Sequence, residues 1–363
     1  MRFHAHAVFN RACIFYCGGA FLVLMFFCLC FLSCGAATST STNPQPTPAP
    51  TPTPGTPAIT SPSSGASVLS PLMFTGSVAG VPNVDHSQLF LDNTSSIYYG
   101  GALPMKNKWM FVPDGQHTLT LTAYDKNNNA LASTSANVDV SGQTSPAALP
   151  ELQSIPAWQF CSQDLAGSEC ASGLGVATST QTQNVATPSL SGASTQFSLG
   201  GAQAYSNALW WISLGGGTLL SNFTYALDFY IDNADAPEAL EFDVNQSFGG
   251  NRYTYGTECS YKNTHHWDVW NPLAEAWVPS SVPCPPVASN QWHHLQWQFQ
   301  RVNNQVHYIS ITLDGTATPV NMYFNLEPNW KPEDIDIAFQ MDGDYKQTPY
   351  NVWLDNVTLT ASY

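Results

Sequence analysis

The chain has 363 residues, 44% of them hydrophobic but only 10% charged, and its formal net charge at pH 7 is −15. It is long enough for two domains with buried cores. The few basic residues make nucleic acid and anionic membrane surfaces poor partners, because phosphate groups bind clustered Lys and Arg side chains. Neutral glycans and cations are compatible with this charge.

Residues 1–37 have the pattern of an export signal: two arginines, an apolar run over 14–32 and then small residues. The apolar run is also long enough for a membrane anchor. The segment Phe31–Cys34 resembles a bacterial lipoprotein box, which implies lipidation of Cys34. A cleaved signal, a membrane anchor and a lipoprotein leader would all lead to export of the residues that follow. We therefore expect a cell-surface lipoprotein or a secreted protein that meets the membrane only through its N-terminus.

Residues 38–57 are rich in Pro, Thr and Ser and cannot bury a core. Such a run favours an extended polyproline conformation and acts as a semi-rigid spacer. We therefore expect a linker that holds the folded part away from an anchored N-terminus.

Short strand-like runs separated by turn residues fill residues 58–142, at intervals typical of a β-sandwich. In the strongest run Leu119, Leu121 and Ala123 alternate with threonines. The segment 114–125 resembles the penultimate strand of bacterial Ig-like domains, which act as spacers or adhesive units. We expect an Ig-like domain here, followed by a linker over residues 143–155.

Residues 156–363 show almost no helical periodicity. Strands without intervening helices indicate an antiparallel sandwich or barrel, and a jelly roll of two packed sheets is the economical solution at this size. The predicted fold class is all-β, with an Ig-like β-sandwich followed by a larger antiparallel jelly-roll sandwich. The expected strands lie at 195–199, 209–214, 223–232, 240–248, 253–259, 292–301, 306–313, 320–324, 335–341 and 351–359.

Three short motifs follow one another in this C-terminal part: Trp292-His293-His294, Asp314-Gly315 and Trp353–Leu359. Their order is similar to the W-H-H, D-G, D-N-V progression of the concanavalin A-like lectin/glucanase superfamily. The resemblance spans residues 156–363. It implies a curved jelly roll whose concave face meets carbohydrate.

The strand expected at 240–248 carries a row of polar side chains. Because side chains alternate between the two faces of a strand, its apolar residues can enter a core while Glu241, Asp243 and Asn245 line the opposite face. This row is either the polar floor of a sugar-binding cleft or the solvated side of an antiparallel sheet.

Other expected strands carry similar rows of Gln, Asp, Asn and Tyr without Lys, which suit recognition of sugar hydroxyl groups. A tryptophan-rich excursion between Cys259 and Cys284 could stack on sugar rings, and we expect at least one of its indoles to be exposed. We expect all these groups along one shared hollow. The predicted ligand-binding residues are Tyr230, Asn245, Gln246, Trp267, Trp270, Trp277, His294, Gln296, Gln298 and Gln340.

Retaining glycosidases of the superfamily carry Glu-x-Asp-x-(x)-Glu on one strand. The resemblance assigns the nucleophile to Glu241 and the helper carboxylate to Asp243. The third position falls on Asn245 or Gln246, and an amide cannot protonate a leaving group. A hydrolase therefore needs an acid from another strand, for which the candidates are Asp228, Glu258 and Asp342.

A polysaccharide lyase is a further alternative, since jelly-roll lyases use a Tyr or His base beside Gln, Asn or Arg. The acidic surface argues against a polyuronate substrate. The residues of suitable type are Arg252, Tyr253, Tyr255, His294, Gln298 and Tyr345.

Five of the nine cysteines lie in the leader, and the other four are expected to form disulfides in an oxidising compartment. Proximity in the sequence favours Cys161 with Cys170 and Cys259 with Cys284, although three pairings are possible. A zinc site is disfavoured because no CxxC pair is present. Calcium is the one cofactor that the sequence suggests: acidic turns at 232–235 and 342–344 either contribute to a structural calcium site or are ordinary turns.

The sequence thus favours an exported, non-catalytic carbohydrate-binding protein whose partner is a polysaccharide or glycan. The alternatives are a glycoside hydrolase with Glu241 and Asp243 in the cleft, a polysaccharide lyase, and a structural surface or adhesion protein. The missing third carboxylate is what separates binding from hydrolysis.

Overall fold

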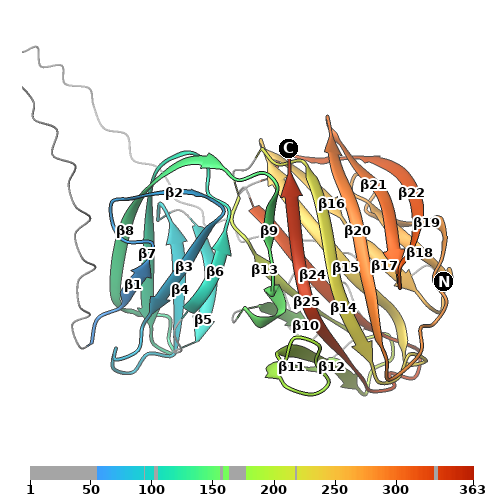
Figure 1. Ribbon diagram of the computed structural model, residues 1–363. Coiled ribbons are helices and arrows are strands. Elements are labelled where there is room, and N and C mark those ends of the chain that lie inside the picture. Colours follow the sequence, from blue (N-terminus) through green and yellow to red (C-terminus); the bar gives the residue numbers. More distant parts are fainter. Residues whose placement is uncertain are drawn as a thin grey trace, which may run out of the picture.

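The computed structural model describes residues 55–93, 95–101, 105–155, 158–162, 177–216, 219–330 and 334–363. Within these ranges the regular elements are β-strands, apart from the short 3₁₀ turn η1 (Leu152–Ser154). Figure 1 shows a smaller N-terminal and a larger C-terminal β-sandwich. The predicted all-β fold class is confirmed. No helix in the described part of the chain is long and apolar enough to span a bilayer.

The N-terminal sandwich consists of a three-stranded and a five-stranded sheet. Its core contains Phe74, Leu89, Leu119 and Leu121, none of which has any exposed surface. The first sheet has the order β1 (Ala58–Ser61), β3 (Leu72–Ser77), β6 (Met105–Met110), and the second has the order β2 (Ala66–Ser70), β8 (Ala130–Gln143), β7 (Gly115–Tyr124), β4 (His86–Leu91), β5 (Ser95–Gly101).

The C-terminal sandwich has two large sheets, here called the β14 sheet and the β15 sheet. The β14 sheet has the order β11 (Ala177–Val185), β12 (Ser194–Gly201), β25 (Tyr350–Ser362), β14 (Asn222–Ile231), β20 (Trp292–Val302), β21 (Gln305–Leu313), β22 (Thr316–Asn325). The β15 sheet has the order β10 (Gln159–Ser162), β13 (Asn207–Ser213), β24 (Asp334–Gly343), β15 (Pro237–Phe248), β17 (Thr257–Ser260), β18 (His266–Asn271), β19 (Ala276–Pro283), and β16 (Asn251–Tyr255) pairs with β15 and with β23 (Glu327–Pro328).

Aromatic side chains join the two sheets face to face. The rings of Phe229 and Phe242 lie 5.7 Å apart, and those of Trp267 and Trp297 lie 5.6 Å apart. Both pairs link a strand of the β14 sheet to a strand of the β15 sheet. Since each strand alternates inward and outward side chains, the sandwich has two outward faces on opposite sides. We call them the β14 face and the β15 face.

The segment 143–155, predicted as a linker, contributes to the C-terminal sandwich. Its strand β9 (Ala147–Leu149) pairs with β25, and Leu149 and Leu152 are fully buried. A second contact joins the two sandwiches, because the Phe111 amide donates to the Leu214 carbonyl at 2.6 Å. A Cβ atom at Gly215 would lie 2.2 Å from the Phe111 carbonyl oxygen, so this approach requires glycine.

The motifs that carry the family resemblance form internal clamps. Asp314 accepts hydrogen bonds from the His294 amide at 2.9 Å and pairs with His293 Nδ1 at 2.8 Å. Asp355 accepts bonds from the hydroxyl groups and amides of the 189–191 loop. These residues therefore hold turns and loops in place.

Candidate functional site

Strand β15 presents its polar row outward, as its alternation predicts. Leu240, Phe242 and Val244 have no exposed surface and face the core. Glu241 and Asn245 point the other way but are only 3% exposed each. The row therefore lies on the β15 face, yet it is recessed rather than openly solvated.

Neighbouring strands add further polar groups beside this row. On β24, Gln340 lies directly opposite Glu241, and on β17 Glu258 lies opposite it from the other side. Asp342 is two residues beyond Gln340 on the same face, and Asp268 pairs with Glu258 from β18. The carboxyl cluster is defined as Glu241, Asp243, Glu258, Asp268 and Asp342.

Side-chain and backbone donors reach part of this cluster, among them Thr264 Oγ1, which donates to Asp268 at 2.7 Å, Asn207 beside Asp342 and Ser260 beside Glu258. Gln340 Nε2 donates to Glu241 Oε1 and also to Asp342 Oδ1, the latter at 3.1 Å. The Thr257 amide donates to Asp243 at 2.9 Å, and Asn245 Nδ2 donates to Asp336 at 2.7 Å. Within the described residues, the buried oxygens Asn245 Oδ1 and Asp342 Oδ2 have no hydrogen-bond partner. Buried oxygens of this kind are normally satisfied by a ligand, an ion or water.

The pKa values of the cluster are raised. Burial, followed by the charges of Asp342, Asp243 and Glu258, raises the pKa of Glu241 well above its usual range. Burial likewise raises the pKa of Glu258 well above its usual range, those of Asp243 and Asp342 to about 7, and that of Asp268 to about 6. Crowded carboxyl groups without cations retain protons near neutral pH, so the cluster can both donate and accept hydrogen bonds.

Arg252 lies at the β16 end of this face and is only 5% exposed. Its guanidinium group lies 4.4 Å from the centre of the Trp330 ring. Burial lowers the pKa of Arg252, while Asp336 and Glu327 raise it. Its charge is thus directed mainly at those carboxylates, and the carboxyl cluster stays largely uncompensated.

A pair of tryptophans borders the cluster. Trp270 and Trp277 are paired across β18 and β19, with ring centres 5.2 Å apart. Gly256 makes room for them, since a Cβ atom there would lie 2.8 Å from Trp270 Cβ. Trp270 is 8% exposed and Trp277 is half-buried. We expect at least one exposed indole; Trp267 faces the core, Trp270 and Trp277 cover each other, and Trp277 is the one of the three that keeps part of its surface open.

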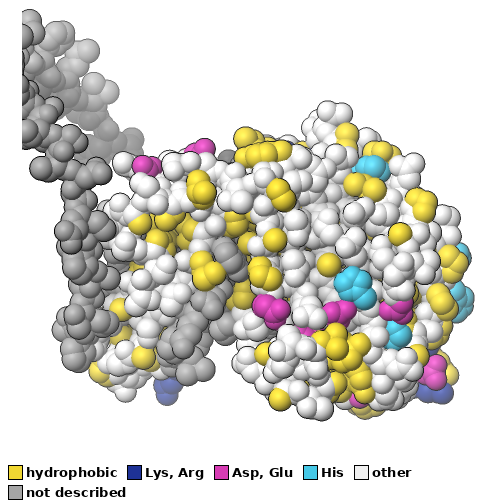
Figure 2. Space-filling model, in the orientation of Figure 1, with side chains coloured by type: hydrophobic (Ala, Val, Ile, Leu, Met, Phe, Trp, Pro, Cys, Tyr) yellow, Lys and Arg dark blue, Asp and Glu magenta, His cyan; other side chains and the backbone are white. Residues whose placement is uncertain are grey.

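The predicted single hollow is also wrong, because the predicted residues divide between opposite faces. Asn245, Trp270, Trp277 and Gln340 lie on the β15 face with Glu241 and Asp243. Tyr230, His294, Gln296 and Gln298 belong to β14 and β20 and lie on the β14 face, the side from which Figure 2 views the molecule. Gln246 and Trp267 point into the core, with 0% and 2% exposure.

Of the candidate acids from other strands, folding brings Glu258 and Asp342 to Glu241, whereas Asp228 lies on the β14 face. The lyase residues are not brought together. Tyr253 and Tyr255 are buried, while His294 and Gln298 lie on the β14 face.

Sequence reasoning missed Asp268 and Gly256. Asp268 lies in His266–Asn271, where the alternation of inward Trp267 and Val269 with outward Asp268 and Trp270 marks a strand. This alternation can be recognised in the sequence, although the segment is predicted above only as a tryptophan-rich excursion.

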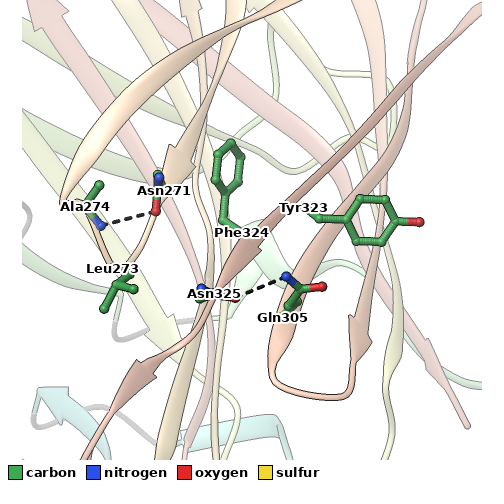
Figure 3. A pocket seen from close by; sticks show the side chains of 7 residues that line it. All are labelled: Asn271, Leu273, Ala274, Gln305, Tyr323, Phe324 and Asn325. Carbon is green, nitrogen blue, oxygen red and sulfur yellow. Dashed lines mark hydrogen bonds between the residues drawn. The ribbon is translucent and has the colours of Figure 1, made fainter.

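A separate cavity of about 260 Å³ lies where the β18–β19 turn approaches β21 and β22 (Figure 3). Its amide side chains are ordered: Gln305 Nε2 donates to Asn325 at 3.1 Å, and Asn271 accepts from the Ala274 amide at 3.2 Å. No member of the carboxyl cluster lines it. The lining residues are Asn271, Leu273, Ala274, Gln305, Tyr323, Phe324 and Asn325.

The predicted disulfide between Cys259 and Cys284 is present. The side chain of Cys161, together with Cys170 and Cys34, lies outside the described residues. Among the described residues no group of His, Cys, Asp and Glu is arranged to hold a metal ion. In the turns considered for calcium, Asp344 pairs with Lys262 at 2.8 Å and Asp232 accepts from Asn351 at 2.6 Å.

No protein-family model and no curated protein matches this chain. Among solved structures it is similar to carbohydrate-binding modules of the β-sandwich superfamily, with 10% identity, a TM-score of 0.31, and coverage of 84% of this chain and 98% of that one. It is also similar to the carbohydrate recognition domain of Emp47p (8% identity, TM-score 0.35, 60% and 98% covered).

A third similar structure is an alginate lyase (10% identity, TM-score 0.32, 47% and 81% covered). At such identities and TM-scores we draw no conclusion about fold, ligand or reaction from these similarities. The two large, mainly antiparallel sheets by themselves make the C-terminal part of this chain a jelly-roll type of β-sandwich.

Proposed function

We propose that the C-terminal sandwich binds a neutral polysaccharide on the β15 face. The observation that supports this most is the recessed group of carboxyl and amide side chains with two buried, unpartnered oxygens, Asn245 Oδ1 and Asp342 Oδ2. Sugar hydroxyl groups both donate and accept hydrogen bonds, and half-protonated carboxyl groups and amides match them in both roles. The net charge of −15 disfavours a polyanionic glycan.

Trp270 and Trp277 supply the apolar part of such a site. They lie on the same face as Glu258 and Asp268, since Asp268 and Trp270 are two residues apart on β18. Sugar rings have apolar faces that stack on aromatic rings. A site with acidic and amide groups on its floor and an indole at its border can orient a sugar through both kinds of contact.

The proposal is tested by calorimetric titration with a panel of neutral β-glucan oligosaccharides. We expect binding by the wild-type protein, and a loss of at least about 10-fold in affinity for Glu241→Gln and for Asn245→Ala. Asp139→Asn, at an exposed position of β8 in the N-terminal sandwich, is the control and should bind as the wild type does. Wild-type-like binding by both β15-face variants would overturn the proposal, as would the absence of binding to every oligosaccharide.

Hydrolysis of a glucan is the second candidate function, and the pairing of Glu241 with Glu258 favours it. Residues paired directly across strands have Cβ atoms about 4.5–5.5 Å apart, and a retaining glycosidase needs carboxyl groups about 5–5.5 Å apart. One group donates its proton to the leaving oxygen while the other attacks the anomeric carbon, and water then releases the sugar. Glu258 thereby replaces the carboxylate that Asn245 lacks.

Release of reducing sugar from the same glucans tests this second candidate. Activity that disappears in both Glu241→Gln and Glu258→Gln, with binding retained in Glu258→Gln, is the expected result for an enzyme. If the wild type binds a glucan and releases no sugar from it, the protein is a binding protein only.

We also propose that residues 1–37 direct export with lipid attachment at Cys34, and that the N-terminal sandwich is an Ig-like spacer. The support is the sequence of the leader and of residues 114–125. Intact-mass analysis of the protein from a bacterial membrane fraction should give a chain that begins at Cys34 and carries acyl groups. A chain that retains residues 1–33 would contradict lipidation.

A further inference from the structure

We propose that the β14 face carries a second carbohydrate-binding surface, built on a row of three aromatic side chains. Trp353 on β25 lies opposite Tyr230 on β14, and Tyr230 lies opposite Trp292 on β20. We call Trp292, Tyr230 and Trp353 the aromatic row. Gln196 on β12 extends it on the far side of Trp353.

The Tyr230 ring contacts the rings of both tryptophans, and all three side chains point away from the core. The ring centres of Tyr230 and Trp292 are 5.6 Å apart, and those of Tyr230 and Trp353 are 5.4 Å apart. Each of the three side chains is half-buried, while their chain neighbours Phe229 and Leu354 are fully buried on the inner side. The aromatic row is therefore outside the hydrophobic core.

Figure 2 shows a hydrophobic patch on this side of the C-terminal sandwich, close to histidine and acidic side chains. Apolar patches with a polar border on a soluble protein commonly mark a binding surface. Aromatic pairs across strands also stabilise a sheet. Binding and stability are therefore measured separately below.

Ordered polar groups flank the row on one side. The Tyr230 hydroxyl donates to Asn290 at 3.2 Å, and Gln196 Nε2 donates to Asn351 at 3.1 Å. Asn351 in turn donates to Asp232 at 2.6 Å. These bonds hold amide groups at the rim of the rings, where they can meet the hydroxyl groups of a stacked sugar.

On the other side of the aromatic row, the β14 face becomes polar. His294 is 48% exposed and its Nδ1 lies 2.9 Å from Asp228 Oδ1. Beyond it Gln296 and Gln298 follow along β20, opposite Ala226 and Thr224. A surface with an aromatic end, an amide border and acidic rather than basic neighbours fits a neutral polysaccharide chain and disfavours an anionic one.

The two faces lie on opposite sides of one rigid sandwich. A protein with a binding surface on each can hold two polysaccharide chains at once, and tethering of one surface raises the effective concentration at the other. Bridging needs both surfaces and therefore rests on the proposed function of the β15 face. The aromatic row as a binding surface does not.

Binding to two insoluble neutral β-glucans, microcrystalline cellulose and curdlan, tests the aromatic row. We expect Trp353→Ala and Tyr230→Ala to weaken binding at least about 10-fold. Trp292→Tyr should stay close to wild type because it keeps a ring. Tyr323→Ala, which removes an exposed aromatic residue of the same sheet outside the row, is the matched control and should bind within about 2-fold of wild type. Thermal unfolding of each variant separates lost binding from lost folding.

The results distinguish this inference from the proposed function. If row variants that remain folded bind as the wild type does while Glu241→Gln and Asn245→Ala lose binding, the aromatic row is not a site and the β15 face is. If the row variants lose binding while Glu241→Gln and Asn245→Ala bind as the wild type does, the aromatic row is a binding surface and the proposed site on the β15 face is wrong. No binding of the wild type to either glucan contradicts the inference.

Agglutination of glucan-coated beads tests bridging. The wild type should agglutinate the beads. A folded variant of either face should still coat them through its other face at a higher protein concentration, yet fail to agglutinate them. Agglutination that persists in row variants would show that the row is not needed for bridging.

Discussion

Two buried carboxyl sites, one in each sheet of the C-terminal sandwich, have opposite chemistry. Asp355, on β25, has no exposed surface and accepts hydrogen bonds from the hydroxyl groups and amides of the 189–191 loop and from Gln153. Burial opposes its ionisation, but the bonds from Ser191 and Ser189 outweigh burial and hold its pKa below the usual value. Asp355 is a satisfied, structural anion.

Glu241, on β15, is almost as deeply buried, yet its pKa is raised well above the usual range, chiefly by burial and by Asp342. Its neighbours are further carboxyl groups, and one amide, Gln340, serves both Glu241 and Asp342. Burial alone therefore does not set the direction in which the pKa of a carboxyl group moves. The hydrogen-bond donors and the charges around each group decide it.

The largest loss of stability is expected at Asp355, because many hydrogen-bond donors share this one carboxylate. Asp355→Ala removes the shared acceptor of the part-buried donors of the 189–191 loop and of buried Gln153, and should lower the free energy of unfolding by about 3–5 kcal/mol. Urea denaturation at pH 7 measures this. A loss below about 1 kcal/mol would mean that the loop does not depend on this carboxylate.

The pH dependence of that loss is a second check. Because the pKa of Asp355 is lower in the folded chain, its contribution is present above the unfolded-state pKa of about 4 and disappears as the pH falls through the folded value. The difference between wild type and Asp355→Ala should therefore shrink in acid.

The disulfide should have the next largest effect, and one limited to the β15 face. Cys259 and Cys284 close a loop with a sequence separation of 25, and their replacement by serine should cost about 3.5 kcal/mol. The loop carries Asp268, Trp270 and Trp277, so glucan binding at the β15 face should weaken while binding at the aromatic row persists. Equal loss at both faces would contradict separate surfaces.

The carboxyl cluster should make stability fall as pH rises. A group whose pKa is higher in the folded chain holds its proton more tightly there, so the free energy of unfolding decreases from the unfolded-state pKa of about 4 through the folded value. For Asp243 and Asp342 that folded value is about 7. Asp342→Asn should therefore raise stability at pH 8 by about 1–2 kcal/mol and flatten the slope between pH 4 and pH 7.

Asp228→Asn, on the β14 face, is the control for this measurement. Asp228 already has two partners, His294 and Asn356, so removal of its charge relieves no crowding. We expect no gain in stability at pH 8. An equal gain in Asp228→Asn would mean that the protein's overall negative charge, rather than the cluster, sets the slope.

The smallest effect belongs to His294→Gln. Its ring is 48% exposed and its ion pair with Asp228 is at the surface, so the change in unfolding free energy should stay below about 1 kcal/mol. Chemical denaturation at pH 6 measures it. A larger loss would mean that the β14 face contributes more to folding than its open position indicates.

Much of the fold was predictable from two-residue alternation. It placed Leu240, Phe242 and Val244 in the core and Glu241 and Asn245 outside, as the structure has them. It also marked the ten strands expected in residues 156–363, although 253–259 is divided at Gly256 into β16 and β17. Strands β10, β11, β18 and β19 are not among the expected ones: β18 does show alternation, whereas the prolines of β19 obscure its pattern.

The candidate site was less predictable, because alternation fixes which side of a strand a residue faces and not which sheet the strand joins. Glu241 meets Gln340, which is 99 residues away in sequence, through a strand pairing that no local pattern specifies. His294 has the same local pattern as Glu241 but lies on the opposite face. The family-like motifs could not correct this, since Asp314 and Asp355 serve loops rather than the site.

The most direct test of this account is a ¹³C NMR titration of the side-chain carboxyl groups, with and without a neutral β-glucan oligosaccharide. We predict that Asp243 and Asp342 titrate near pH 7 in the free protein, and that the resonances of Glu241 and Asp342 shift when the oligosaccharide is added. Carboxyl groups that titrate near their ordinary values of about 4, with resonances indifferent to the sugar, would contradict it.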